Sequence, residues 1–190
     1  MRCLIALFSL FFAFNIGNGA TISKDEFLQE MSTSEPYWLM SRNYEDMKDA
    51  QKKVCISTTR VQSEDNVGIV FRQKYKFDGC EWSSYTQDAD YNVNFTETTT
   101  AGAGLLISMA PIKTFDVLTT KNYSLEYWNA TEGCFLYKLL NSEDARHCEL
   151  LAWDRNATEN PRFPGCEDAY TRTCSNTTEY SFFNEYCRIS

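Results

Sequence analysis

The chain has 190 residues and a formal net charge of −8, with 18 lysine and arginine residues against 26 aspartate and glutamate residues. Such an acidic protein repels nucleic acids and anionic membrane surfaces, so neither is an expected partner. No linker, low-complexity tract or internal repeat divides the sequence, and its length fits a single domain.

Residues 1–19 are predicted to be a secretory signal peptide. Arg2 precedes an apolar run from Leu4 to Phe14, and the small residues Gly17 and Gly19 follow at the spacing of a cleavage site. The apolar run is too short to span a membrane. We therefore expect a secreted, extracellular domain over residues 20–190 that does not insert into membranes.

The remaining sequence predicts short strands between two helices. Ser23 and Glu26 form a capping box for a short helix in "SKDEFLQEM". Alternation of apolar and polar residues then predicts about eight antiparallel strands, at 37–44, 53–61, 67–77, 91–98, 113–120, 122–128, 134–140 and 148–153. The longest apolar stretch after the signal peptide, 104–112, is interrupted by Pro111. This all-β pattern is typical of a sandwich or an up-and-down barrel.

A late helix is expected in "CEDAYTRTC" (166–174). Cys166, Tyr170 and Cys174 recur every four residues and so share one face, which two disulfides could fasten to the sheet. Removal of Cys3 with the signal peptide leaves seven cysteines, an odd number, and the count alone does not select their pairing. A zinc site is not expected, because the chain has no C-x2-C pair and a single histidine.

Five N-x-S/T sequons predict N-glycosylation, at Asn94, Asn122, Asn129, Asn156 and Asn176. If the glycans of Asn94 and Asn122 point outward, strand alternation turns Tyr91, Val93, Phe95 and Glu97 inward, as it does Tyr123, Leu125 and Tyr127.

Two carboxylates fall on faces that otherwise look apolar. In "HCELLAW" (147–153), Glu149 shares its face with Leu151 and Trp153, and Glu97 shares its face with aromatic residues. A buried carboxylate is costly unless it is paired. Each acid could lie at a strand end where the face meets water; alternatively, both line a cavity and a cationic ligand supplies the missing charge.

The run from Cys134 to Cys166 resembles the C-terminal signature of tick salivary lipocalins, where a cysteine strand, a Glu-Leu strand and a cysteine that opens a helix follow one another. The signal peptide, the early helix and the terminal cysteine also fit in order. The resemblance implies an eight-stranded antiparallel up-and-down lipocalin barrel, with a short N-terminal and a C-terminal helix, that captures small host mediators and so counters host inflammatory and immune defence.

The same resemblance implies the disulfides and the site. The disulfides would be Cys55–Cys187, Cys134–Cys166 and Cys148–Cys174, with Cys80 free. A biogenic amine such as histamine or serotonin would be held by Glu149 and Glu97, with aromatic walls that contribute cation–π attraction. The aromatic residues expected in this site are Tyr44, Phe115 and Trp153.

The sequence departs from the family's amine-binding pattern at Phe135, Leu151 and Met47, where acidic or aromatic residues are usual. These departures favour the alternative of a hydrophobic mediator, such as a fatty acid, leukotriene or sterol. Direct binding of a host immune protein or cell is a third reading, and it would require an exposed apolar patch.

The sequence argues against an enzyme, and no cofactor or metal is expected. His147 is the single histidine available for a catalytic triad. Two inward glutamates could act as a glycosidase pair only at the right separation.

Overall fold

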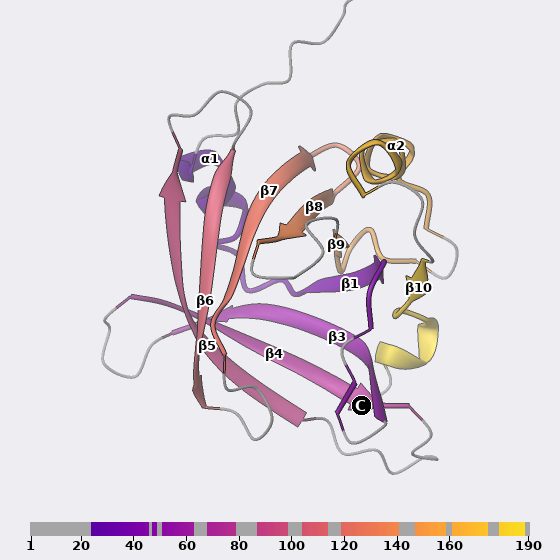
Figure 1. The fold of residues 1–190 in the computed structure, drawn as a ribbon, viewed down its shortest axis with the longest axis horizontal. Coiled ribbons are helices and arrows are strands. Elements are labelled where there is room, and N and C mark those ends of the chain that lie inside the picture. The colour runs from indigo at the N-terminus through magenta and orange to yellow at the C-terminus, as the bar shows by residue number, and fades with distance from the viewer. Residues whose placement is uncertain are drawn as a thin grey trace, which may run out of the picture.

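The computed structural model describes residues 24–45, 47–48, 51–62, 68–78, 87–98, 104–113, 119–140, 147–158, 161–174 and 179–188. Strands dominate, with one helix near each end of the described chain (Figure 1). The elements are α1 (Lys24–Glu30), β1 (Tyr37–Arg42), β2 (Met47–Lys48), β3 (Gln51–Val61), β4 (Ile69–Phe77), β5 (Gln87–Glu97), β6 (Leu105–Lys113), β7 (Lys121–Asn129), β8 (Cys134–Leu139), β9 (Cys148–Trp153), α2 (Pro164–Cys174), β10 (Tyr180–Ser181) and the 3-10 helix η1 (Glu185–Arg188).

Eight strands close into an antiparallel up-and-down barrel. From β3 to β9 each strand pairs with the next in the sequence, and β1 pairs with both β9 and β3, which closes the sheet. The two-residue strands β2 and β10 extend the sheet beside β3 and β1. The predicted eight-stranded barrel with two helices is therefore confirmed.

The strand between β5 and β7 differs from the prediction. The strand observed there is β6, Leu105–Lys113, which covers most of the apolar stretch that Pro111 interrupts. Of the described residues in the predicted strand 113–120, only Lys113 belongs to β6. Residues 114–118 of the predicted strand lie outside the described residues. Pro111 is tolerated because it pairs with Tyr91 directly beside a register shift, where a missing N–H disturbs the ladder least.

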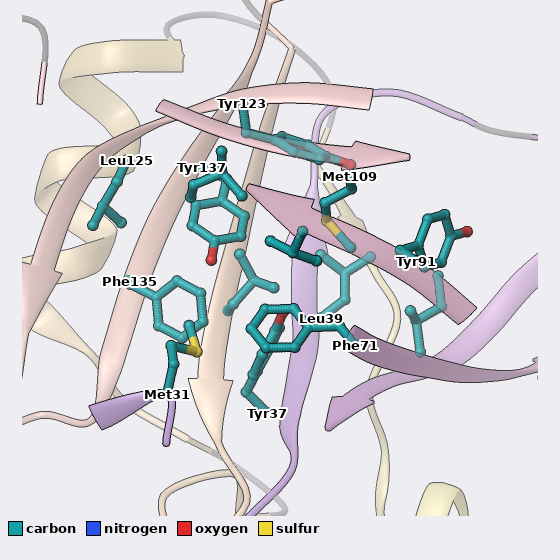
Figure 2. Packing of buried hydrophobic residues seen from close by; sticks show 14 of the residues in the cluster. Met31, Tyr37, Leu39, Phe71, Tyr91, Met109, Tyr123, Leu125, Phe135 and Tyr137 are labelled. Carbon is teal, nitrogen blue, oxygen red and sulfur yellow. The ribbon is translucent and has the colours of Figure 1, made fainter. Parts of the chain in front are cut away.

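Aromatic side chains fill the barrel, as Figure 2 shows for Tyr37, Phe71, Phe135 and Tyr137. The centroid of the Phe135 ring lies 5.2 Å from that of Tyr37, in an edge-to-face arrangement, and 5.1 Å from that of Tyr137, in a tilted one; aromatic pairs prefer such geometries to a face-to-face sandwich. On β9, Leu151 and Trp153 belong to this interior cluster, whereas Cys148, Leu150 and Ala152 pack outside the barrel. The predicted alternation of "CELLAW" is confirmed.

Helix α1 closes one end of the barrel. Phe27 is fully buried, and its ring centroid lies within 6.4 Å of those of Phe95, Trp128, Phe135 and Tyr137.

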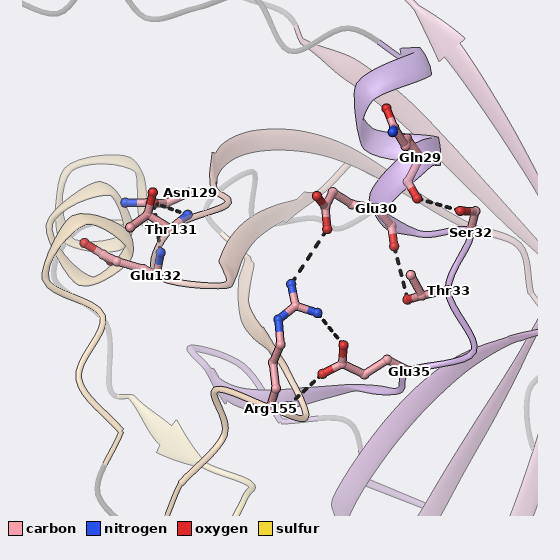
Figure 3. A network of polar contacts seen from close by, with 9 residues as sticks. All are labelled: Gln29, Glu30, Ser32, Thr33, Glu35, Asn129, Thr131, Glu132 and Arg155. Atoms are coloured by element: carbon pink, nitrogen blue, oxygen red, sulfur yellow. Dashed lines mark hydrogen bonds and ion pairs between the residues drawn. The ribbon is translucent and has the colours of Figure 1, made fainter.

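Polar contacts join this end of the barrel to the loop after β9 (Figure 3). Arg155 donates its backbone N–H to Glu35 at 2.8 Å, forms an ion pair with the same carboxylate, and lies 3.7 Å from Glu30 at the end of α1.

Three disulfides hold the outer elements, with the pairing that the family resemblance implied. Cys134–Cys166 and Cys148–Cys174 fasten the inner face of α2 to β8 and β9, and Cys55–Cys187 ties β3 to the C-terminal segment. Helix α2 begins at Pro164, a favourable first helical position. Cys80 lies outside the described residues.

A register shift in β7 reverses the predicted inward direction of Tyr127. Tyr123 and Leu125 point inward as expected, but the β7–β8 register shifts between Leu125 and Tyr127. Beyond this point Trp128 packs against the interior, and Tyr127 packs outside beside α2. The inward prediction for Tyr127 is therefore wrong, because a bulge reverses the alternation.

Candidate functional site

The barrel end opposite α1 holds a small polar cavity, which we call the mouth cavity. Its volume is about 20 Å³, room for about one water molecule. Strands from every side of the barrel contribute to it: the lining residues are Leu39, Arg42, Lys53, Ile56, Thr58, Gln73, Tyr91, Met109, Lys121, Tyr123, Glu149 and Leu151.

Glu149 is the carboxylate of this cavity. It is 8% exposed, and its Oε1 accepts hydrogen bonds from the hydroxyl groups of Tyr44 and, at 3.3 Å, Tyr123. The Tyr44 ring stacks on the imidazole of His147, with centroids 4.8 Å apart. The structure thus brings together Glu149 and Tyr44, two of the residues that the sequence predicted for the site.

Arg42 is a cavity residue that sequence reasoning missed. It pairs in register with Glu149 across β1 and β9 and is only 2% exposed. Its Nε donates to the Tyr44 carbonyl at 2.9 Å, and its guanidinium lies 4.8 Å from the Tyr44 ring and 4.3 Å from the Phe182 ring. Nη2 is buried and has no hydrogen-bond partner within the described part of the chain.

Two lysines add positive charge to the same cavity. Lys53 is buried, with its ammonium nitrogen 4.4 Å from the centre of the Tyr75 ring, and Lys121 is half-buried. Among the described residues that line the cavity, three cations therefore face one carboxylate. The prediction of a site dominated by two acids did not anticipate this balance.

The tyrosines around Glu149 remain protonated hydrogen-bond donors. Burial, and after it the negative charge of Glu149, raises the pKa of Tyr123 well above its ordinary value. Burial is also the main cause that raises the pKa of Tyr137, and electrostatic interactions with Tyr37 and Glu149 add to it. Both phenols therefore stay neutral at physiological pH.

The structure does not bring Glu97 to Glu149. Glu97 is the last residue of β5 and is exposed, so its face meets water at the strand end. The β5 residue that lines the mouth cavity is Tyr91, six positions earlier and about 20 Å away along the strand. The inward placement of Glu97 is thus corrected: the residue continues the alternation of Val93 and Phe95, but it is the last residue of β5, where its face meets water.

Of the other two aromatic residues predicted for the site, Trp153 lies elsewhere in the barrel and Phe115 is not described by the structure. Trp153 points into the barrel but packs against Tyr37, with ring centroids 5.7 Å apart, and it is not among the residues that line the mouth cavity. Phe115 lies outside the described residues.

A bulge in β1 explains why Arg42 was missed. The β1–β9 register shifts between Leu39 and Ser41. Strict alternation from Tyr37 and Leu39 would turn Ser41 inward and Arg42 outward, whereas the shift turns Arg42 toward Glu149. The sequence carries no turn or glycine signal at this point.

The sequons have unequal exposure. Asn94 is exposed on β5, while Asn122, Asn129 and Asn156 are half-buried, and Asn176 lies outside the described residues. The Asn129 side-chain oxygen accepts the backbone N–H groups of Thr131 and Glu132, each at 3.0 Å (Figure 3). Glycosylation at the five positions stays a prediction.

One group of potential metal ligands occurs in the part of the chain that the structure describes: Glu132, Cys134 and Cys166. The two sulfur atoms form a disulfide with each other, so neither is a thiolate that could bind a metal. Glu132 instead accepts the backbone N–H groups of Gly165 and Cys166 at the start of α2.

Comparison with known proteins agrees with the fold. The model of the tick histamine binding protein family matches residues 22–189. The solved structure of Japanin from Rhipicephalus appendiculatus bound to cholesterol is similar, with a TM-score of 0.54 and 13% sequence identity over 80% of this chain and 94% of that one. No curated protein matches the sequence. Among the described residues, no helix is long and apolar enough to cross a membrane.

Proposed function

This chain belongs to the tick histamine-binding protein family, and from that premise we propose that it is a secreted lipocalin that binds a small amphipathic ligand with an acidic group in the mouth cavity. By sequestering such a host mediator at the bite, it would counter host inflammatory and immune defence.

The observation that carries this proposal is the buried guanidinium of Arg42 with its unpartnered Nη2. A buried donor without a partner costs about 1–3 kcal/mol, and a ligand carboxylate would remove that cost. Guanidinium groups bind carboxylates with two parallel hydrogen bonds, and the Tyr44 and Phe182 rings already orient this one. Lys53 and Lys121 add attraction for an anion.

The apolar part of the ligand would contact Leu39, Met109 and Leu151, which line the same cavity. The present volume of about 20 Å³ is far below the roughly 300–1,000 Å³ of ordinary ligand sites, so binding requires side chains to move. Met109 is the residue best suited to this, because a methionine side chain is unbranched and adapts its shape.

A protonated amine is the second candidate. Glu149 is a buried carboxylate beside the rings of Tyr44 and Tyr123, which favours a cationic ligand. Against it stand the three cations that line the cavity and the position of Glu97 at a strand end.

Matched ligands that differ in charge distinguish the two candidates. Isothermal calorimetry at pH 7 would compare indole-3-acetate with tryptamine, which share a ring, and oleate would test a long tail. We expect indole-3-acetate or oleate to bind with one site per chain, and to bind weakly to Arg42→Met. Amine binding that disappears in Glu149→Gln, together with no carboxylate binding, would contradict the proposal and support the second candidate.

A further inference from the structure

Two sequons lie in one row across the strands β5, β6 and β7, which are neighbours in the sheet (Figure 1). Asn94 on β5 pairs in register with Ser108 on β6, and Ser108 pairs in register with Asn122 on β7. Side chains directly opposite each other on antiparallel strands point to the same face of a sheet. Neighbouring strands lie about 4.8 Å apart, so the two asparagines are about 10 Å apart.

This row lies on the outside of the barrel. Phe95 follows Asn94 and belongs to the interior cluster, as does Tyr123 after Asn122. Alternation therefore turns both asparagines outward, with Ser108 between them. Asn94 is exposed, and the other two residues of the row are half-buried. The small Ser108 side chain leaves room for a bulky group on each side of it.

The surface around this row is uncharged. The next outward row toward the mouth cavity holds Asn92 and Ala110, and the next row toward α1 holds Thr96, Leu106 and Ser124. We call these three rows the outer wall. None of their described residues is charged, although soluble domains usually cover their surface with charged side chains. The neighbouring strand β4, by contrast, turns three charged side chains outward: Arg72, Lys74 and Lys76.

An exposed apolar side chain borders the outer wall beside Asn122. The backbone N–H of Leu140 donates to the Asn122 carbonyl at 2.8 Å, which continues the β7–β8 ladder, and the Leu140 side chain is 46% exposed. A glycan is bulky and solubilising. Attached to Asn122, it would cover Leu140 and supply the solubility that the uncharged wall lacks.

We propose that Asn94 and Asn122 both carry N-glycans and that these two glycans form a single carbohydrate cover over the outer wall. Each glycan restricts the access of enzymes to the other, because their attachment points are only two strand spacings apart. The cover closes this side of the barrel to protein partners. It lies outside the barrel and does not depend on the proposed function.

Glycopeptide mass spectrometry tests the proposal on the full chain secreted from cultured mammalian cells, because it measures the occupancy and the glycan type of each sequon. We expect both asparagines to be occupied and to keep mannose-rich glycans, since crowding hinders the processing enzymes. In Asn94→Gln, the share of processed, complex-type glycan at Asn122 should rise several-fold. In Asn122→Gln, the same rise is expected at Asn94.

Thr131→Ala is the matched control. It removes the sequon of Asn129 and keeps the backbone N–H that the Asn129 side chain accepts. Asn129 ends β7, about 23 Å along the strand from Asn122, so the glycans of the outer wall should not change. Thr96→Ala removes the Asn94 sequon through a different residue and should reproduce the effect of Asn94→Gln.

Two results would overturn the proposal. If either Asn94 or Asn122 is unoccupied in the wild-type protein, no joint cover exists and the outer wall is free for a protein partner. If processing at Asn122 is the same with and without the Asn94 glycan, the two glycans do not shield each other.

Discussion

Arg42 and Glu149 lie opposite each other in the antiparallel ladder between β1 and β9, and both side chains are buried in the barrel. Tyr44 contacts both of them: its carbonyl oxygen accepts the Arg42 Nε–H, and its hydroxyl donates to Glu149. One residue at the mouth thus orients a cation and an anion. Substitutions of the two charged residues should therefore affect an acidic ligand in opposite directions.

Arg42→Met should weaken binding of an acidic ligand by about 1.5–3 kcal/mol, the range for a charged hydrogen bond. Stability should fall, because the buried Glu149 carboxylate loses the opposite charge across the ladder and the Tyr44 carbonyl loses its Nε–H donor. Calorimetry with the carboxylate and urea unfolding measure the two effects. Arg172→Met, on the exposed face of α2, is the control. Unchanged carboxylate affinity in Arg42→Met would remove the basis of the proposed function.

Glu149→Gln should strengthen binding of the same acidic ligand, by on the order of 1 kcal/mol, because it removes a negative charge from the cavity. The amide oxygen can still accept the hydroxyl groups of Tyr44 and Tyr123, so the geometry should be retained. Parallel calorimetric titrations of this variant and the wild-type protein provide the measurement. A weaker carboxylate interaction would mean that Glu149 contacts the ligand through a hydrogen bond that the amide cannot replace.

The sequence predicted the fold well because the relevant signals are local. Period-two alternation identified most barrel strands and the inward face of Glu149, and the spacing of Cys166, Tyr170 and Cys174 identified the buried face of α2. The family resemblance supplied the three disulfides. These features depend on neighbouring residues or on the order of motifs, both of which can be read from a single chain.

The charge balance of the site could not be predicted, because it depends on bulges and strand ends. A shift of one residue in β1 exchanges the faces of Ser41 and Arg42, and a similar shift in β7 exchanges Tyr127 and Trp128. Glu97 obeys the alternation but lies where β5 ends. The way in which distant strands pair decides all these placements. It cannot be read from the alternation of residues within one strand.

Phe27→Ala should lower the free energy of unfolding by about 3–5 kcal/mol, the usual cost of truncating a buried phenylalanine. Phe27 is fully buried and is the residue through which α1 contacts four rings of the barrel interior. Urea unfolding followed by tryptophan fluorescence measures the loss. Ile112→Ala, at a site 53% exposed, should change stability by less than about 0.5 kcal/mol. A small effect of Phe27→Ala would mean that α1 is not part of the cooperative core.

The disulfides should rank in stability by the length of chain they close. Cys55–Cys187 joins residues 132 apart and Cys148–Cys174 residues 26 apart. Loop-closure entropy gives about 4.7 kcal/mol for a loop of about 100 residues and about 3 kcal/mol for one of 15. Replacing both cysteines of a pair by alanine should therefore cost more for Cys55–Cys187. Denaturant unfolding of the two double variants compares them directly. The reverse order would show that packing of α2, and not the unfolded chain, determines the effect.

Asp90→Asn should destabilise the protein at neutral pH but not in strong acid. Arg72 donates two hydrogen bonds to Asp90 between β4 and β5, each at 2.8 Å. These hydrogen bonds are the main cause that lowers the pKa of Asp90 in the folded protein. Because its folded pKa lies below the unfolded value of about 3.9, the carboxylate stabilises the fold above that pH. The stabilisation is lost as the pH falls through the folded pKa.

The Asp90→Asn effect should be modest at pH 7, about 0.5–1 kcal/mol, because the Arg72 side chain is 42% exposed and water screens the pair. Urea unfolding of the wild-type and variant proteins at several values between pH 7 and pH 2 measures the difference. Asp88→Asn, an exposed neighbour on the same strand, serves as the control and should show no such pH dependence. A stability difference for Asp90→Asn that stayed constant down to pH 2 would show that the side chain acts through packing, because protonation of the wild-type carboxyl must abolish an effect of its charge.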